Sequence, residues 1–156
     1  MSIYEALAGV YDDLTSDVAY GRRADYLERL FQKSRLPVRT VLDLACGTGS
    51  MTAVLTERGY ELIGVDESPD MLAVAREKAA GLKGEPPVFL NQSMPKLDLY
   101  GTVEAAVCCL DSLNYLTSPR EVQRTFERLA LFIAPGGILI FDINSASYLR
   151  DLNGQV

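Results

Sequence analysis

The sequence contains no histidine and no tryptophan, and it contains only three cysteines. Without histidine, the chain excludes Ser-His-Asp and Cys-His catalysis and every metal site that needs a histidine ligand. Three cysteines are too few for a four-cysteine zinc site. The side chains of the adjacent Cys108 and Cys109 would also point to opposite faces of a strand. We therefore expect no bound metal, and a reduced chain located in the cytoplasm.

Long apolar runs and an excess of positive charge are also absent. No run approaches the roughly 20 apolar residues that cross a bilayer, and the first residues lack the basic and apolar segments of a signal peptide. The 15 Lys and Arg are outnumbered by 21 Asp and Glu, which gives a net charge of −6. This balance disfavours a membrane or a nucleic acid as the main partner. With 156 residues, of which 48% are apolar, we expect one domain with its own core.

Short apolar runs alternate with helical patterns along the chain. Strands are predicted over 39–45, 60–65, 88–90, 103–110 and 138–143. Helices are predicted over most of 4–31, over 50–58, from Ser68-Pro69 to just before Gly81, and over 118–133, where Pro135-Gly136-Gly137 ends the last helix. This alternation indicates a parallel sheet with helices on both faces. We predict a Rossmann-like, doubly wound α/β fold with strand order 3-2-1-4-5.

A glycine-containing loop follows the first predicted strand. Gly47 and Gly49 allow the backbone to turn sharply and to approach a ligand closely. Asp66 ends the second predicted strand, 19 positions after Gly47, where an acid can bind ribose hydroxyls. In such a sheet the ligand binds at the carboxyl ends of the strands, here between strands 1 and 4. The pattern favours a nucleotide-like ligand, and the alternative is a tight strand-to-helix turn without one.

Charge distinguishes between the possible ligands. A dinucleotide site has a third glycine in the pattern G-x-G-x-x-G, and that position is Thr52 here. Asp43, just before the turn, would repel a pyrophosphate but suits a cation. S-adenosylmethionine has a ribose and no phosphate, and it carries a sulfonium and an ammonium. A charge-assisted hydrogen bond between Asp43 and such a group contributes roughly 1.5–3 kcal/mol. With Asp66 and Asp111 at the same rim, the residues favour S-adenosylmethionine over a dinucleotide.

Five segments carry a resemblance to a known family. VLDLACGTGSMTAVL (41–55) and GVDESPDMLAVAREKA (64–79) resemble the first two motifs of the class I S-adenosylmethionine-dependent methyltransferases. The segments 106–116 and 133–144 resemble the fourth- and fifth-strand motifs of a small-molecule-type branch, and 11–30 resembles its N-terminal cap. The resemblance implies a helical cap over 1–36, a cofactor-binding Rossmann-like domain over 37–156, and methyl transfer to a small-molecule acceptor, with S-adenosylhomocysteine as product.

The resemblance also implies roles for individual residues. Those expected at the methionine end of the cofactor are Asp43, Ala45, Cys46 and Gly47, and Gly49 of the same loop is also expected to bind the cofactor. Those expected at the ribose and adenine are Asp66, Glu67, Met71, Gln92, Ser93 and Met94. Those expected beside the transferred methyl or closing over the cofactor are Tyr11, Tyr20, Leu110 and Asp111.

No catalytic base is assigned, because methyl transfer depends mainly on positioning and desolvation. Tyr11, Tyr20 and Tyr115 are candidates to line the path of the methyl group. Cys46 is expected to contribute backbone rather than a nucleophile, since no neighbouring base would lower its pKa.

The sequence departs from the family pattern in four places. Ala45 stands where the family loop often has glycine, Ser93 where an acid often binds the adenine amine, and Arg23 where the cap often has an aromatic residue. Family members also continue past the fifth strand towards seven strands, whereas this chain ends at Val156. The apolar strand over 138–141 would then be an exposed edge, which either pairs in a homodimer or belongs to a fragment.

Two other functions stay open from the sequence. The chain could be a cofactor-binding module without its own catalysis, or a nicotinamide-dependent oxidoreductase. A nucleic-acid partner would need the basic residues of 22–35, which are more simply a solvated helix face.

Overall fold

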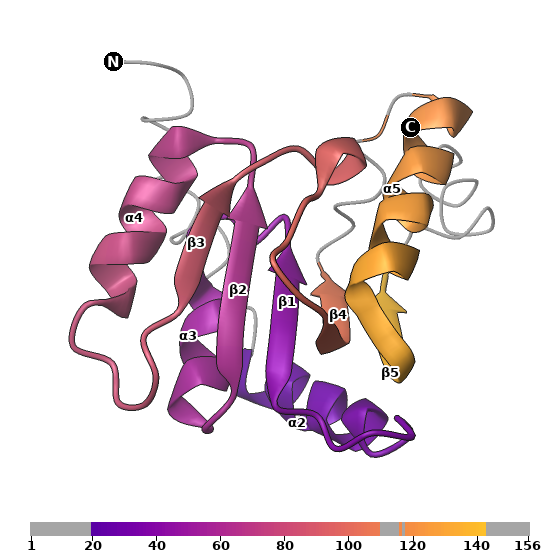
Figure 1. Ribbon diagram of the computed structural model, residues 1–156. Coiled ribbons are helices and arrows are strands. Elements are labelled where there is room, and N and C mark those ends of the chain that lie inside the picture. The colour runs from indigo at the N-terminus through magenta and orange to yellow at the C-terminus, as the bar shows by residue number, and fades with distance from the viewer. Residues whose placement is uncertain (1–19, 110–115, 117, 143–156) are drawn as a thin grey trace, which may run out of the picture.

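The computed structural model describes residues 20–109, 116 and 118–142 (Figure 1). Its helices are α2 (Tyr20–Phe31), α3 (Ser50–Glu57), α4 (Pro69–Ala79), the short 3-10 helix η1 (Met94–Lys96) and α5 (Pro119–Phe132). Its strands are β1 (Thr40–Leu44), β2 (Glu61–Asp66), β3 (Val88–Asn91), β4 (Val103–Cys108) and β5 (Ile133–Phe141). Neighbouring strands are parallel and ordered β3-β2-β1-β4-β5, which confirms the predicted fold class and strand order.

Two serine caps define where helices begin. The Ser68 hydroxyl accepts a hydrogen bond from the Met71 amide at 3.2 Å, and Pro69 occupies the first turn of α4. The same arrangement starts α5, where the Ser118 hydroxyl accepts from the Glu121 amide at 3.2 Å. Each cap satisfies an amide that the helix itself leaves unpaired. Both predicted starts are confirmed.

Helices cover both faces of the sheet, as a doubly wound fold requires. On one face, α2 and α3 contribute buried side chains that join Val41 of β1 and Ala105 of β4 in one core cluster. In Figure 1 these two helices lie behind the strands. The next residues along the two strands, Leu42 and Ala106, face the opposite way into a second cluster. The sheet is therefore buried on both sides, which explains its near-continuous apolar strands.

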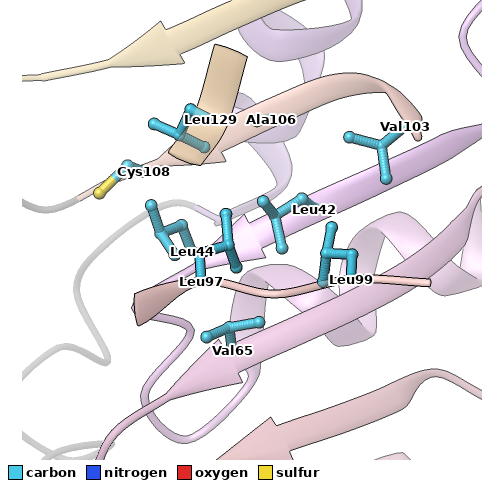
Figure 2. Close-up of a cluster of buried hydrophobic side chains, with 9 residues drawn as sticks. All are labelled: Leu42, Leu44, Val65, Leu97, Leu99, Val103, Ala106, Cys108 and Leu129. Atoms are coloured by element: carbon cyan, nitrogen blue, oxygen red, sulfur yellow. The ribbon is translucent and has the colours of Figure 1, made fainter. Parts of the chain in front are cut away.

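The second cluster is filled partly by a connection rather than by a helix. Figure 2 shows Leu97 and Leu99, from the segment between β3 and β4, lying against the strands in the cluster that also includes Leu129 of α5. Leu97 and Leu129 are 0% and 2% exposed. The β3–β4 connection is thus fixed in the core, and it holds the preceding loop at the carboxyl end of β3.

The helix α2, which is the described part of the predicted cap, shares the core of the sheet. Ala24, Leu27 and Phe31 are buried in the same cluster as Val41. The predicted boundary between 36 and 37 therefore divides segments that pack together, and it stays a prediction. No helix in the described part of the chain is long and apolar enough to cross a membrane.

The transition from α5 to β5 differs from the prediction. The sequence predicted that Pro135-Gly136-Gly137 ends the helix, but α5 stops at Phe132 and β5 already starts at Ile133. The pairing with β4 shifts register, because Val103 faces Ile133 whereas Ala105 faces Ile138. The extra residues are accommodated in an irregular segment in which Gly136 has a φ of +93°. Gly136 and Gly137 therefore lie in a strand irregularity and not at a helix end. Local sequence patterns do not distinguish these two situations.

Other element boundaries are close to those predicted. β4 is described over Val103–Cys108, shorter than the expected 103–110. β5 is at the edge of the described sheet, and Phe141 is 41% exposed there. Pairing of this edge in a homodimer stays a prediction.

Candidate functional site

Asp66 links the glycine loop to the following helix. Its Oδ2 accepts a hydrogen bond from the Gly47 amide at 2.9 Å, and its Oδ1 accepts from the Ser68 amide at 2.9 Å. The Asp66 carbonyl also accepts from the Gln92 amide at 3.1 Å. The carboxylate is therefore fixed in position. Because each of its oxygens can accept more than one hydrogen bond, both keep capacity for a ligand hydroxyl.

The loop after β1 has three residues in the left-handed backbone region. They are Ala45, Gly47 and Gly49, with φ values of 59°, 57° and 79°. A Cβ atom on Gly49 would lie 2.9 Å from the Ala75 Cβ of α4. The loop therefore needs glycine at 49 both for its backbone conformation and for its close approach to α4. Ala45 adopts the left-handed region with a side chain, at a cost of roughly 1–2 kcal/mol.

Asp43 is a buried acid at the end of β1. It is 3% exposed, and its Oδ2 accepts a 2.6 Å hydrogen bond from the Thr52 hydroxyl of α3. The pKa of its carboxyl is raised from 3.8 to about 6, mainly by burial and in addition by the charge of Asp66, while hydrogen bonds from Thr52 partly offset the rise. A cationic ligand beside this carboxylate would offset the cost of its burial.

A small cavity adjoins Asp43 at the carboxyl ends of β1 and β4, where the strand order reverses. Its volume is about 30 Å³, which exceeds the roughly 10–15 Å³ that one ordered water requires. The residues that line it are Tyr20, Arg23, Asp43, Ala45, Cys46, Thr48, Ser50, Met51 and Cys109. The location is the one that the sheet topology predicted.

The cavity brings together only part of the predicted set. Tyr20, Asp43, Ala45 and Cys46 were expected there, and they do line it. The sequence did not single out the other five residues as ligand contacts. From sequence, Arg23 was considered as a departure from the family and as part of the basic stretch 22–35, although its spacing of three from Tyr20 places both on one face of α2. That helical spacing is the signal that could have identified it.

Arg23 gives the cavity a positive charge in addition to the acid. Its Nη1 lies 3.7 Å from Asp142 Oδ2 at the end of β5, and both side chains are about 40% exposed. An ion pair this exposed contributes little to stability. The guanidinium is therefore available to exchange Asp142 for another anion at small cost.

The two cysteines that line the cavity are not activated. Burial raises the pKa of the Cys109 thiol to about 12, and the charge of Asp43 adds to the effect. The same two causes raise the pKa of the Cys46 thiol still further. Both side chains are therefore protonated thiols at neutral pH. This agrees with the expectation that Cys46 contributes no nucleophile.

The residues expected at the adenine lie apart from this cavity. Glu67 is exposed, and Met71, Ser93 and Met94 are half-buried. The Gln92 amide is already used, because its Nε2 donates to the Asp98 carbonyl at 2.9 Å and its Oε1 accepts from the Asp98 amide at 3.0 Å. This pair of bonds closes the loop after β3. A cofactor contact by Gln92 thus stays a prediction, while its contact with Asp98 is a structural role that the sequence did not indicate.

Four expected residues fall outside the described part of the chain. They are Tyr11, Leu110, Asp111 and Tyr115. Their roles stay predictions.

Comparison with known proteins agrees with this geometry. Residues 41–137 match the family model described as a methyltransferase domain. The chain belongs to this methyltransferase family. Over 152 residues it is 39% identical to the Bacillus subtilis protein named "Putative methyltransferase YqeM", covering 96% of this chain and 59% of that protein.

Solved structures support the same assignment. A crystal structure of an S-adenosylmethionine-dependent methyltransferase from Clostridium acetobutylicum matches with a TM-score of 0.83 and 30% identity, covering 97% of this chain and 61% of that one. The sugar N-methyltransferase KedS8 from a Streptoalloteichus species matches with a TM-score of 0.76 and 28% identity, covering 86% of this chain and 53% of that one. This chain thus spans between about half and three fifths of the length of these relatives.

Proposed function

We propose that the chain binds S-adenosylmethionine across the carboxyl ends of β1 and β2 and acts in methyl transfer to a small-molecule acceptor. The observation that carries the proposal is the 2.9 Å hydrogen bond from the Gly47 amide to Asp66 Oδ2. This bond joins the glycine loop to an acid with capacity for ribose hydroxyls. The family match over residues 41–137 supports the same cofactor.

The chemistry of the described side chains fits this cofactor. Its methionine end carries an ammonium and a carboxylate, and the cavity offers Asp43 and Arg23 as partners of opposite charge. A pyrophosphate fits poorly, because buried Asp43 would repel it in a medium of low dielectric constant. This difference, with the family match, argues against a nicotinamide-dependent oxidoreductase.

The tasks of the chain in this reaction are binding and orientation. S-adenosylmethionine supplies a methyl group already activated on a sulfonium. Asp66 would hold the ribose, while Asp43 and Arg23 would fix the methionine end. Holding a cofactor in one orientation lowers the entropic cost of reaction. The protonated thiols of Cys46 and Cys109 add no reactive thiolate beside the sulfonium.

A small amine is the first class of acceptor to test. Among the relatives, a glycine/sarcosine/dimethylglycine N-methyltransferase from Actinopolyspora halophila is 34% identical over 116 residues, which is 73% of this chain and 20% of that protein. The sugar N-methyltransferase KedS8 also acts on nitrogen by its name. A panel of amino acids and amino sugars, assayed for methyl incorporation, tests this class. Incorporation only into other acceptors would contradict it.

Calorimetric titration with S-adenosylhomocysteine tests the cofactor assignment directly. We expect micromolar binding by the chain and a loss of at least tenfold for Asp66→Ala, since a charged hydrogen-bonding partner is worth roughly 1.5–3 kcal/mol. Asp98→Ala is the matched control, because it removes a carboxylate that is 76% exposed. Equal affinities for wild type and Asp66→Ala would overturn the site.

Turnover separates an enzyme from a binding module. Binding without methyl incorporation by this chain, together with incorporation by a longer version, would favour the module.

Two features bear on the cellular compartment and the oligomeric state of the protein. All three cysteines are free thiols, which suits a reducing cytoplasm. The β5 edge, with partly exposed Phe141, suits pairing with a second copy. Light scattering that gives twice the monomer mass, and a monomer for a Phe141→Lys variant with an unchanged circular dichroism spectrum, would support the homodimer.

A further inference from the structure

Lys78 reaches from α4 to the glycine loop. Its Nζ lies 2.8 Å from the Ser50 hydroxyl and 3.4 Å from the Thr48 hydroxyl. Both hydroxyl-bearing residues line the cavity beside Asp43, and Thr48 is 0% exposed. A single ammonium therefore connects two wall residues of the cavity to a helix that lies outside it.

The same face of α4 also packs against Gly49, which lies between Thr48 and Ser50 in the sequence. Gly49 lies so close to α4 that an added Cβ would be 2.9 Å from the Ala75 Cβ. Ala75 and Lys78 are three residues apart and so lie on one helix face. The small Ala75 side chain next to Gly49 and the Lys78 ammonium next to Ser50 together fix the position of this part of the loop.

We propose that Lys78 is a positioning residue of the cofactor site. It acts through the hydroxyls of Ser50 and Thr48. It fixes the segment between Gly47, which is bound to Asp66, and the start of α3. This inference rests on the proposed function for its ligand, but the placement of the loop does not.

The test compares Lys78→Met with Lys78→Arg and with Lys83→Met. Lys83 is exposed in the loop after α4, so its substitution makes the same change of charge without touching the site. We expect Lys78→Met to weaken S-adenosylhomocysteine binding roughly five- to tenfold, the scale of one hydrogen bond. We expect Lys78→Arg, which keeps a cationic donor, to retain affinity to within about twofold of wild type, and Lys83→Met to match wild type. Thermal unfolding should separate these effects from a loss of fold.

Two further measurements test whether Lys78 acts by holding the loop and through the Ser50 hydroxyl. Amide hydrogen exchange in the ligand-free chain should be faster at residues 48–51 in Lys78→Met than in Lys83→Met. In a double-mutant cycle, Lys78→Met should cost little once Ser50→Ala is present. Unchanged exchange together with unchanged affinity would overturn the inference, and fully additive effects would overturn the route through Ser50. A wild-type chain that does not bind the ligand would overturn the proposed function, while the exchange experiment still decides whether Lys78 holds the loop.

Discussion

The Thr52 hydroxyl donates a 2.6 Å hydrogen bond to the buried carboxylate of Asp43. From sequence, Thr52 stood out only as the residue that replaces a third glycine. Its position in α3 gives it a different importance, because it supplies a hydroxyl donor to an acid that is 3% exposed. Thr52, which stands where a dinucleotide site has its third glycine, thus lowers the pKa of Asp43 at the other end of the loop.

Replacing Asp43 by asparagine is expected to stabilise the fold at neutral pH. Folding raises the pKa of the Asp43 carboxyl from 3.8 to about 6, so folding favours the protonated form. Its contribution to stability is full below pH 4 and is lost as the pH rises through 6. A difference of about 2 pKa units corresponds to about 3 kcal/mol, and the neutral amide avoids this loss.

Denaturant unfolding at pH 4 and pH 8 measures the effect. Relative to wild type, Asp43→Asn should gain about 3 kcal/mol between the two pH values, and the exposed control Asp98→Asn should gain almost nothing. The same Asp43→Asn variant should lose affinity for S-adenosylhomocysteine. A variant that is less stable than wild type at pH 8 would show that the ionised acid is not a burden on the fold.

Binding of S-adenosylhomocysteine is expected to weaken as the pH falls through about 6, because protonation of Asp43 removes the charge that faces the ligand ammonium. Thr52→Val removes the hydrogen bond that lowers this pKa, so the midpoint should move to higher pH. Thr52→Ser keeps a hydroxyl and should keep the midpoint near that of wild type. Titrations between pH 5 and 8 locate these midpoints, and a shared midpoint for Thr52→Val and Thr52→Ser would exclude the hydroxyl as the cause.

Gly137→Ala is expected to destabilise the chain strongly. A Cβ atom there would overlap the Glu104 carbonyl oxygen and would lie 2.9 Å from the Ala134 carbonyl oxygen. Backbone atoms cannot move aside as a flexible side chain can, so we expect a loss of about 3 kcal/mol, the scale of severe overpacking. Gly101→Ala is the matched control, since nothing lies within 4 Å of its Cβ position. Chemical denaturation measures the free energy of unfolding of the two variants. Equal values would show that position 137 does not lie as close to the Glu104 and Ala134 carbonyls as described.

Sequence patterns were sufficient to predict the sheet and to assign Gly47 and Asp66 to one site. Alternating apolar runs fix the parallel strands, and right-handed crossovers then leave few orders. The spacing of 19 between Gly47 and Asp66 predicted that both residues belong to one site with Asp66 at the ribose, while the 2.9 Å hydrogen bond between them is a finding of the structure. Both inferences use short-range regularities, which a single sequence carries explicitly.

The other features depend on which side chains meet across the fold. Gln92 bonds to the backbone of Asp98 because the loop after β3 closes on itself, and Lys78 meets Ser50 because α4 packs against α3. Neither contact has a periodic signature. The Gly136-Gly137 irregularity depends on the register between β4 and β5, and register is set by pairing rather than by local propensity.

Arg23 is expected to bind the carboxylate of the methionine end by exchanging its present partner. Its ion pair with Asp142 is long, at 3.7 Å, and half-exposed, so it costs little to break. Arg23→Gln should therefore weaken S-adenosylhomocysteine binding about tenfold, whereas Asp142→Asn, which releases the guanidinium, should leave affinity unchanged or improve it.

A shortened ligand makes this last prediction specific. Methylthioadenosine keeps the adenine and ribose but lacks the ammonium and the carboxylate, so neither Arg23→Gln nor Asp43→Asn should change its affinity. Asp66→Ala should weaken both ligands, because the ribose is common to them. If Arg23→Gln weakened both ligands equally, Arg23 would act on the shape of the cavity, which it shares with Tyr20 on α2, rather than on the ligand carboxylate.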